Sequence, residues 1–256
     1  MTDERLRAEI ERAITGNELV LQYQPRVLVS SLELRGVEAL VRWRDPVRGI
    51  VSAAELIEAA EQAGLMRDVE VWVIREALLQ AAVWRRDGMR VGVSVNIGPA
   101  LLRDEPFLRL FERALKIQGD PTTLTLEIAA PSLGGADRPL AGLARLREHG
   151  VRLALDDVTT SQHLDAASWI KWDYVKLGRA LVGNAVKDPD AGRRLRIAVD
   201  SASALGVRIV AMGVEDEATL ALTRDLGVFM AQGYLIAPPL GVKELTEWSA
   251  GRTRPA

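Results

Sequence analysis

The sequence predicts an α/β protein built as one (β/α)8 barrel. Segments with strand character alternate with segments of helical periodicity along most of the chain, and this alternation is typical of βαβ units around a parallel sheet. About eight strand candidates occur within 256 residues, which is the usual size of such a barrel. No linker rich in proline, glycine and serine divides the chain. We therefore expect a single domain over residues 1–256, with a core from about 19 to 240.

The expected elements follow one another regularly through the first half of the chain. Residues 3–14 have an apolar stripe at helical spacing, which predicts a short amphipathic helix. Ser52, with Glu55 three residues later, is a capping-box pattern, so another helix is expected from Ser52 to Gly64. The remaining predictions here are three apolar strands and a longer periodic helix: strands 19–29, 34–43 and 90–96, and helix 69–86.

The second half continues the alternation with shorter strands. A helix over 140–149 is expected to end at Gly150, because glycine commonly closes a helix. The tail after Leu240 is expected to fray. The other predicted elements are helices 107–117, 190–205 and 217–226, and strands 122–128, 151–155, 174–176, 207–211 and 229–231.

Composition limits the class of function. The net charge of −2 does not favour attraction to nucleic acid polymers or anionic membranes. The absence of cysteine excludes disulfides and thiol chemistry. No apolar run is long enough to span a bilayer, and the charged N-terminus has no signal-peptide character. We therefore expect a soluble, cytoplasmic protein.

Several oxygen-bearing side chains fall near the carboxyl ends of predicted strands. In a barrel, that rim is where functional sites are built, and carboxylate and amide oxygens suit Mg²⁺ or Mn²⁺. Adjacent Asp156 and Asp157 repel each other and need a compensating cation. A single acidic residue at a strand end is more commonly a solvated or capping group, and periodicity alone does not bring the candidates together. The candidates are Glu38, Asn96, Glu127, Asp156 and Asp157.

Motifs spaced along the chain resemble one known family. The segment Gly36-Val37-Glu38-Ala39-Leu40-Val41-Arg42-Trp43 is similar to the signature of the EAL domain, the bacterial cyclic di-GMP phosphodiesterase family. The likeness extends from about residue 19 to 240. Further motifs recur in the family's order: Tyr23-Gln24-Pro25, Ser94-Val95-Asn96, Leu126-Glu127-Ile128, Leu155-Asp156-Asp157, Val175-Lys176 and Gln232-Gly233-Tyr234-Leu235.

The resemblance implies a modified TIM-like barrel with one antiparallel strand, and hydrolysis of cyclic di-GMP to linear pGpG with two Mg²⁺ or Mn²⁺ ions. It implies that the first metal is held by Glu38, Asn96, Glu127 and Asp156. Asp156 and Asp157 would serve the second metal, and Lys176 would lie near the attacking water. The expected ligand contacts are Gln24, Arg42, Asp156 and Gln232. Taken alone, Arg42 or Lys176 would be read as a surface ion pair.

The chain departs from the family pattern at several of these positions. Met212 stands where active members carry a metal-site glutamate, and a thioether is a poor ligand for hard cations. Ala130 replaces a glutamate that anchors a loop. Val158 and Thr159 open a segment that replaces the glycine-bearing loop after the two aspartates, and this segment is one residue shorter up to Lys176. Gly178 replaces an aspartate.

These departures favour a degenerate member over a working catalyst. We expect very weak or absent phosphodiesterase activity, one surviving site for Mg²⁺ or Mn²⁺ and a doubtful second site. The preferred hypothesis is a receptor that binds cyclic di-GMP and signals to an unidentified protein partner. An interaction scaffold that no longer binds the nucleotide and an active phosphodiesterase remain as alternatives. The resemblance leaves homodimerisation open.

Overall fold

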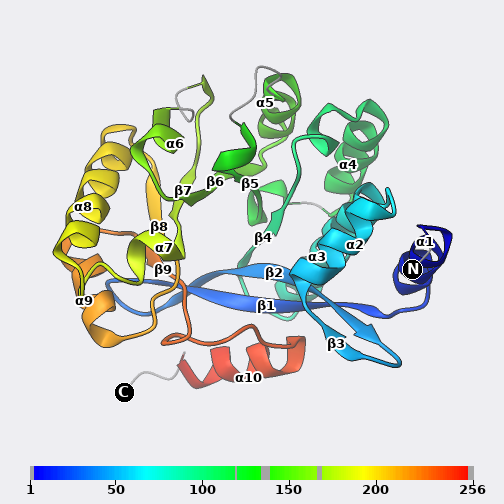
Figure 1. Ribbon diagram of the computed structural model, residues 1–256, viewed down its shortest axis with the longest axis horizontal. Coiled ribbons are helices and arrows are strands. Elements are labelled where there is room, and N and C mark those ends of the chain that lie inside the picture. The colour runs from blue at the N-terminus through cyan, green and yellow to red at the C-terminus, as the bar shows by residue number, and fades with distance from the viewer. Residues whose placement is uncertain (1–2, 119, 134–138, 166–168, 253–256) are drawn as a thin grey trace.

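A computed structural model describes residues 3–118, 120–133, 139–165 and 169–252. Its strands form a closed barrel of eight, with a ninth short strand attached to β2 at the edge (Figure 1). The pairing runs β1-β9-β8-β7-β6-β5-β4-β2-β3, and β1 also pairs with β2 to close the ring. The strands are β1 (Leu19–Leu28), β2 (Leu34–Asp45), β3 (Gly49–Val51), β4 (Gly92–Asn96), β5 (Leu124–Ala129), β6 (Arg152–Val158), β7 (Tyr174–Leu177), β8 (Arg208–Ala211) and β9 (Met230–Ala231).

β1 runs antiparallel to both of its barrel neighbours, β2 and β9, whereas the other barrel pairs are parallel. This confirms the expected modified TIM-like barrel with one antiparallel strand. The carboxyl end of β1 therefore lies at the mouth of the barrel where the other strands begin. A polar residue near that end of β1 consequently faces the opposite mouth from the carboxyl ends of the parallel strands.

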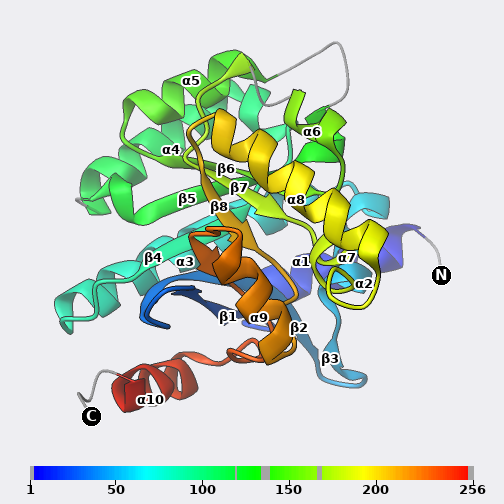
Figure 2. The ribbon, with the colours of Figure 1, turned by 90° about the vertical axis from the view of Figure 1, so that its left-hand side faces the viewer.

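Helices surround the strands on the outside (Figure 1), and α8 and α9 cover the side turned to the viewer in Figure 2. Most of the apolar core lies between the strands and these helices. The helices are α1 (Asp3–Thr15), α2 (Ala53–Gln62), α3 (Met66–Arg86), α4 (Glu105–Gln118), α5 (Leu140–Glu148), α6 (Ser161–Asp165), α7 (Arg179–Val182), α8 (Pro189–Ala204), α9 (Glu217–Asp225) and α10 (Val242–Arg252).

A smaller apolar layer fills the inside of the barrel. Because side chains alternate across a strand, residues two apart share the inner face, and four strands contribute one member each. The layer consists of Ala154, Tyr174, Val210 and Met230. Two residues further along β6 and β7, the same inner face carries Asp156 and Lys176. The apolar layer therefore forms a floor beneath the polar residues at the carboxyl ends of the strands.

The predicted strands and helices are found, with small shifts in their ends. The Ser52 hydroxyl accepts a hydrogen bond from the Glu55 amide at 3.2 Å, which confirms the predicted helix cap. The expectation that the chain frays after Leu240 is wrong for α10, whose fully buried Leu245 packs into the core; residues 253–256 lie outside the described part. β6 runs three residues past Leu155, with a register irregularity before Val158.

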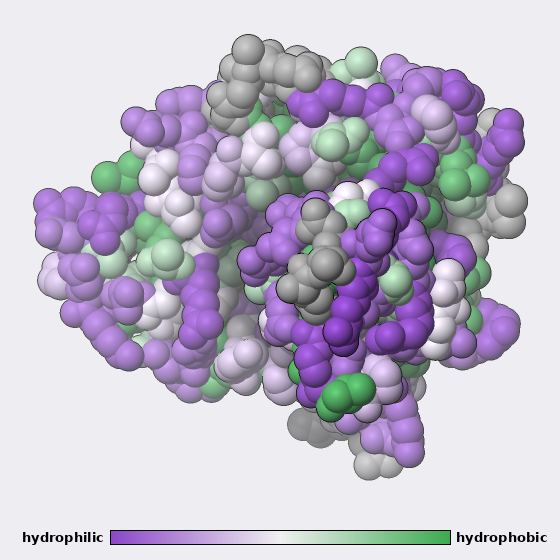
Figure 3. Space-filling view, turned by 45° about the vertical axis from the view of Figure 1, so that its right-hand side comes forward, coloured by the Kyte–Doolittle hydropathy of each residue, from purple (hydrophilic) through white to green (hydrophobic). Residues whose placement is uncertain are grey.

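The described helices include none long and apolar enough to cross a membrane. On the face drawn in Figure 3, hydrophilic residues predominate and hydrophobic ones are scattered rather than gathered into one broad patch. Scattered exposed apolar residues are normal for a globular protein and do not by themselves mark an interaction surface.

Candidate functional site

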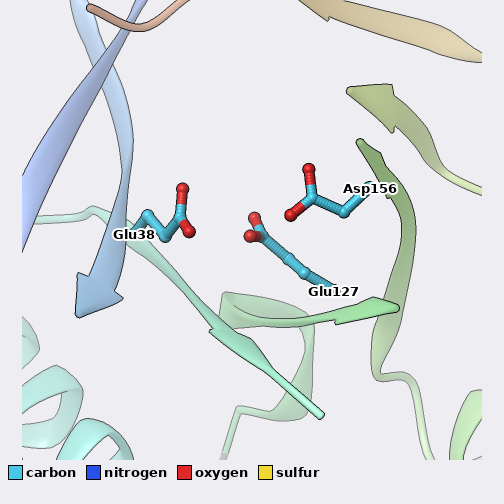
Figure 4. A group of neighbouring side chains, drawn as sticks. All are labelled: Glu38, Glu127 and Asp156. Carbon is cyan, nitrogen blue, oxygen red and sulfur yellow. The ribbon is translucent and has the colours of Figure 1, made fainter. Parts of the chain in front are cut away.

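Three carboxylates from different strands meet inside the barrel above the apolar floor. They are Glu38 on β2, Glu127 on β5 and Asp156 on β6, and each points toward the others (Figure 4). One oxygen of each lies within 4.8 Å of an oxygen of the other two. Glu127 is fully buried and Glu38 is 5% exposed. Buried like charges repel strongly, so this group requires a cation.

Lys176 on β7 supplies one such cation. Its ammonium Nζ lies 3.0 Å from Glu38 Oε2 and 3.1 Å from Asp156 Oδ2, and it also contacts Glu127. Burial alone would lower the pKa of Lys176, but the surrounding carboxylates more than offset this and raise it. The three carboxylates therefore favour the charged form of Lys176, which lies at their centre.

Arg26 on β1 supplies the second cation, from below. Its Nη1 lies 3.0 Å from Glu127 Oε1, and its Nη2 donates to the Val37 carbonyl at 3.2 Å. The pKa of Glu127 is raised chiefly by burial and then by Glu38, while the two cations oppose that rise. The pKa of Glu38 is lowered although burial opposes this, because Lys176, Gln232 and Arg26 favour its charged form.

The donor set fits a single hard divalent cation. Three carboxylates face two buried cationic side chains, which leaves an excess of negative charge, and oxygen donors are the ligands that Mg²⁺ and Mn²⁺ prefer. Asn96, at the end of β4, donates its Nδ2 to Glu38 Oε1 at 3.1 Å. That bond leaves the Asn96 carbonyl oxygen for another partner. Any metal bound here would share its carboxylate ligands with Lys176, which contacts the same three carboxylates.

Two glutamine amides border the carboxylates on the other side. Gln232 Nε2 donates to Glu38 Oε2 at 2.8 Å and to Gln24 Oε1 at 2.9 Å. Gln24 in turn donates to the Ala237 carbonyl at 3.3 Å. Gln232 is 1% exposed, and its own Oε1 has no hydrogen-bond partner among the described residues. A buried carbonyl oxygen without a donor is costly, and here it borders a pocket.

That pocket has a volume of about 170 Å³ and is lined by eight residues: Gln24, Arg179, Met212, Gly213, Glu215, Gln232, Gly233 and Tyr234. Tyr234 is 64% exposed at its edge. Arg42, on β2, is half-buried, and burial lowers its pKa while Tyr234 and Glu38 oppose the shift. The Arg42 guanidinium donates to the Val41 carbonyl at 2.8 Å, which leaves its remaining donors for a ligand.

Asp157, predicted to serve a second metal, lies apart from the three carboxylates. It is exposed, its backbone φ of 52° is in the left-handed region, and its amide donates to Asp156 Oδ1 at 2.8 Å. Its carboxylate occupies the space that a Cβ at Gly178 would need. The glycine at 178 and this conformation of Asp157 are therefore linked. A metal-binding or catalytic role for Asp157 stays a prediction.

The other positions that depart from the family pattern lie in apolar surroundings or in a segment hydrogen-bonded to nearby residues. Met212 follows β8 and packs partly buried against the apolar floor, and its side chain carries no oxygen donor. Ala130 is 3% exposed in a short 3-10 turn, and Val158 is fully buried. The Thr159 amide donates to His163 Nδ1 at 3.3 Å, just before α6 begins at Ser161. The segment after Asp157 thus turns into a short helix.

Arg26 is not among the predicted site residues, although it holds Glu127. The signal was a single charged residue directly before the apolar run Val27-Leu28-Val29, two positions from Gln24 and so on the same strand face. The structure brings together Glu38, Glu127 and Asp156, with Asn96, Lys176, Gln24 and Gln232 around them, which periodicity alone did not establish. What each of them does remains a prediction.

Comparison with known proteins gives one consistent family. The sequence model described as the EAL domain matches residues 7–239. A cyclic di-GMP phosphodiesterase of Pseudomonas aeruginosa is 33% identical over 238 residues, covering 89% of this chain and 39% of that protein. The cyclic di-GMP phosphodiesterase PdeR of Escherichia coli is 29% identical over 246 residues, covering 95% of this chain and 37% of that protein.

A solved structure of a related protein has the same fold. The structure described as the MucR phosphodiesterase in complex with cyclic di-GMP superposes with a TM-score of 0.84 at 27% identity, covering 94% of this chain and 99% of that one. The curated relatives are longer than this chain, which spans less than two fifths of the two phosphodiesterases from P. aeruginosa and E. coli.

Proposed function

The chain belongs to the EAL domain family, and we propose that it binds cyclic di-GMP while hydrolysing it very slowly or not at all. The observation that carries the binding proposal is the unpartnered, buried Oε1 of Gln232 beside Gln24 and the half-buried Arg42. Cyclic di-GMP offers two phosphates and two guanine edges, which require cationic and amide partners of this kind. The likeness to a phosphodiesterase solved with cyclic di-GMP supports this choice of ligand.

Glu38, Glu127, Asp156 and Asn96 would hold one Mg²⁺ or Mn²⁺ ion, in keeping with the metal dependence of EAL domains. A bound divalent ion supplies activation of water and stabilisation of charge on the phosphate. Lys176 is placed among the same oxygens and would donate to a phosphate or to an attacking water. Arg42 would bind a phosphate through its planar fork of donors.

The proposal of slow hydrolysis rests on the side chains available to bind a second metal ion. Met212 has no oxygen for a second ion, and the Asp157 carboxylate is turned beside Gly178. Individual electrostatic contacts of this kind contribute about 10²- to 10³-fold to a rate. Losing two of them would slow hydrolysis by several orders of magnitude. Two relatives named as phosphodiesterases favour the second candidate, an active enzyme that makes pGpG.

Calorimetry and product analysis separate these functions. Cyclic di-GMP is titrated into the protein with Ca²⁺, and the same mixture with Mn²⁺ or Mg²⁺ is followed by chromatography for pGpG. Saturable binding without pGpG supports the proposal, whereas steady pGpG formation with Mn²⁺ supports the enzyme. The absence of binding heat at micromolar protein would instead support a scaffold that has lost the nucleotide.

Arg42→Gln gives a matched test of the binding site. The substitution should weaken cyclic di-GMP binding by roughly tenfold or more, since a charge-assisted bond to a phosphate is worth about 1.5–3 kcal/mol. Arg44→Gln removes the same charge two residues further along β2, at an exposed position, and should leave affinity within about twofold. Equal weakening by both variants would mean that Arg42 acts only through overall charge.

A further inference from the structure

The opposite, N-terminal mouth of the barrel holds a cavity of about 620 Å³. Small-molecule sites in proteins commonly have volumes of about 300–1,000 Å³. The lining contains arginines from strand starts: Arg35 on β2, Arg90 just before β4, Arg152 at the start of β6 and Arg208 at the start of β8. Four strands of the barrel, or the segment just before them, thus each bring one arginine to this mouth.

The strand alternation explains why two of these arginines, Arg152 and Arg208, face the barrel axis. Arg152 lies four residues before Asp156 on β6, whereas Arg90 lines the cavity from the segment just before β4. Even spacings keep residues on one strand face. Arg208 is two residues before Val210 of the apolar floor. That floor lies between the arginine-lined cavity and the carboxylate site on the side of β6 to β9, whereas Arg26 on β1 reaches both. The two sites open at opposite ends of the barrel.

The charges of three of these arginines are poorly compensated, whereas Arg35 lies 3.4 Å from Glu33. Within the described part of the chain, Arg90, Arg152 and Arg208 have no ion pair with a carboxylate. Arg152 and Arg208 share the Tyr174 hydroxyl as acceptor, at 3.5 and 3.4 Å. Asp120 also lines the cavity, but its Oδ1 accepts from the Thr122 amide at 3.0 Å and the Thr122 hydroxyl at 2.6 Å.

Other arginines of this chain do form ion pairs with carboxylates. Arg145, for example, lies 2.8 Å from Glu105 and also contacts Glu112. The whole chain has a net charge of −2, so a general excess of basic residues does not explain the cationic cavity. Like charges gathered in one concave surface attract anions strongly because field lines are focused there.

Arg26 provides an independent sign that a ligand belongs in this cavity. Its side chain is 4% exposed and lines the cavity from the barrel interior. Two of its nitrogens are used by Glu127 and Val37, but its Nε is buried and has no hydrogen-bond partner among the described residues. A buried N–H without an acceptor is costly. An anion oxygen entering the cavity would supply that acceptor.

We propose that the N-terminal mouth of the barrel is a binding site for a small anion with two linked phosphate groups, such as pyrophosphate or a nucleoside diphosphate. Guanidinium groups bind phosphates bidentately, and several arginines arranged around a concave surface favour more than one phosphate. Thr123 and Thr125 add hydroxyls to the lining, and Arg208 stacks on Phe229 at 5.4 Å, which orients its fork. This site does not depend on the nucleotide site proposed above.

The test is calorimetric titration of the protein with inorganic pyrophosphate in EDTA at constant ionic strength. EDTA removes divalent ions, so the carboxylate site cannot hold pyrophosphate through a metal. We expect saturable binding with a Kd below about 1 mM and a higher melting temperature when pyrophosphate is present. No saturable binding, or displacement of pyrophosphate by excess cyclic di-GMP, would overturn the proposal.

Matched variants locate the site. Arg90→Gln with Arg152→Gln should weaken pyrophosphate binding by roughly tenfold or more, because two charge-assisted contacts are lost. Arg113→Gln with Arg196→Gln removes the same charge from exposed positions on α4 and α8 outside the cavity, and affinity should stay within about twofold. Equal weakening in both pairs would refute the proposal. Arg90→Gln alone, at an exposed position, repeats the test if the first pair folds poorly.

Discussion

Glu70 on α3 gives a quantitative test of how the fold supports the site. It is 9% exposed, and its Oε1 accepts a hydrogen bond of 2.6 Å from the Gly98 amide, two residues after Asn96. Burial raises the pKa of Glu70 to about 7, although the bond from Gly98 opposes the shift. Glu70 thereby fixes the backbone that follows the predicted ligand Asn96. Its burial favours the protonated form of the carboxyl group.

The sign of the pH dependence follows from this pKa. A folded-state pKa above the unfolded value of 4.5 means that the folded protein holds the proton more tightly. The associated stability is complete below pH 4.5 and is lost as the pH rises through about 7. At about 1.4 kcal/mol per pKa unit, the difference between the folded and unfolded pKa of Glu70 corresponds to about 3 kcal/mol of folding free energy. Glu70→Gln keeps an oxygen for Gly98 but removes the ionisation.

Urea unfolding of the wild type and Glu70→Gln at pH 5 and pH 8 measures the effect. The free energy of unfolding of the variant, minus that of the wild type, should increase by about 2.5 kcal/mol between the two pH values, because part of the effect is already lost at pH 5. The exposed Glu61→Gln on α2 serves as a control and should change this difference by less than about 0.5 kcal/mol. A difference for Glu70→Gln that is the same at both pH values would refute the reasoning.

Three further predictions concern the carboxylate site. Met212→Glu combined with Ala130→Glu should raise pGpG formation with Mn²⁺, measured by chromatography. Met212→Gln with Ala130→Gln should not, because an amide adds no charge. No gain in the glutamate pair would assign the loss of phosphodiesterase activity to the segment after Asp157. Lys176→Met should lower stability by about 3–5 kcal/mol in EDTA, because it leaves carboxylates buried without their cation, and Mn²⁺ should restore part of the melting temperature; an unchanged melting temperature in EDTA would contradict the central role of Lys176. Arg26→Met should destabilise the protein in the same assay, and a neutral result would mean that Glu127 is held protonated without it.

The sequence was sufficient for the barrel and for most strand faces, since period-two alternation places Asp156, Lys176 and Gln232 inside once the strands are located. It was insufficient for elements too short to show a period, such as α6 and α7. It also failed for α10, because the burial of Leu245 depends on packing against distant parts of the chain. Arg26 was missed because a lone charge in a strand says nothing of its partner: Glu127 is 101 residues away in sequence.

The distinction between a receptor and a scaffold depends on Gln232 more than on the carboxylates. Glu38, Glu127 and Asp156 are neutralised in large part by Lys176 and Arg26, so folding stability alone is reason enough for the chain to retain these charges together. Their presence therefore argues weakly for catalysis or metal binding. The Gln232 Oε1 is different, because it is buried without a donor and gains nothing from the fold. A nucleotide receptor needs that carbonyl, whereas a scaffold does not. Gln232→Leu should abolish cyclic di-GMP binding, and it should also lower the melting temperature because it removes the Nε2 bonds to Glu38 and Gln24. A variant that kept its affinity would mean that the nucleotide does not use this carbonyl.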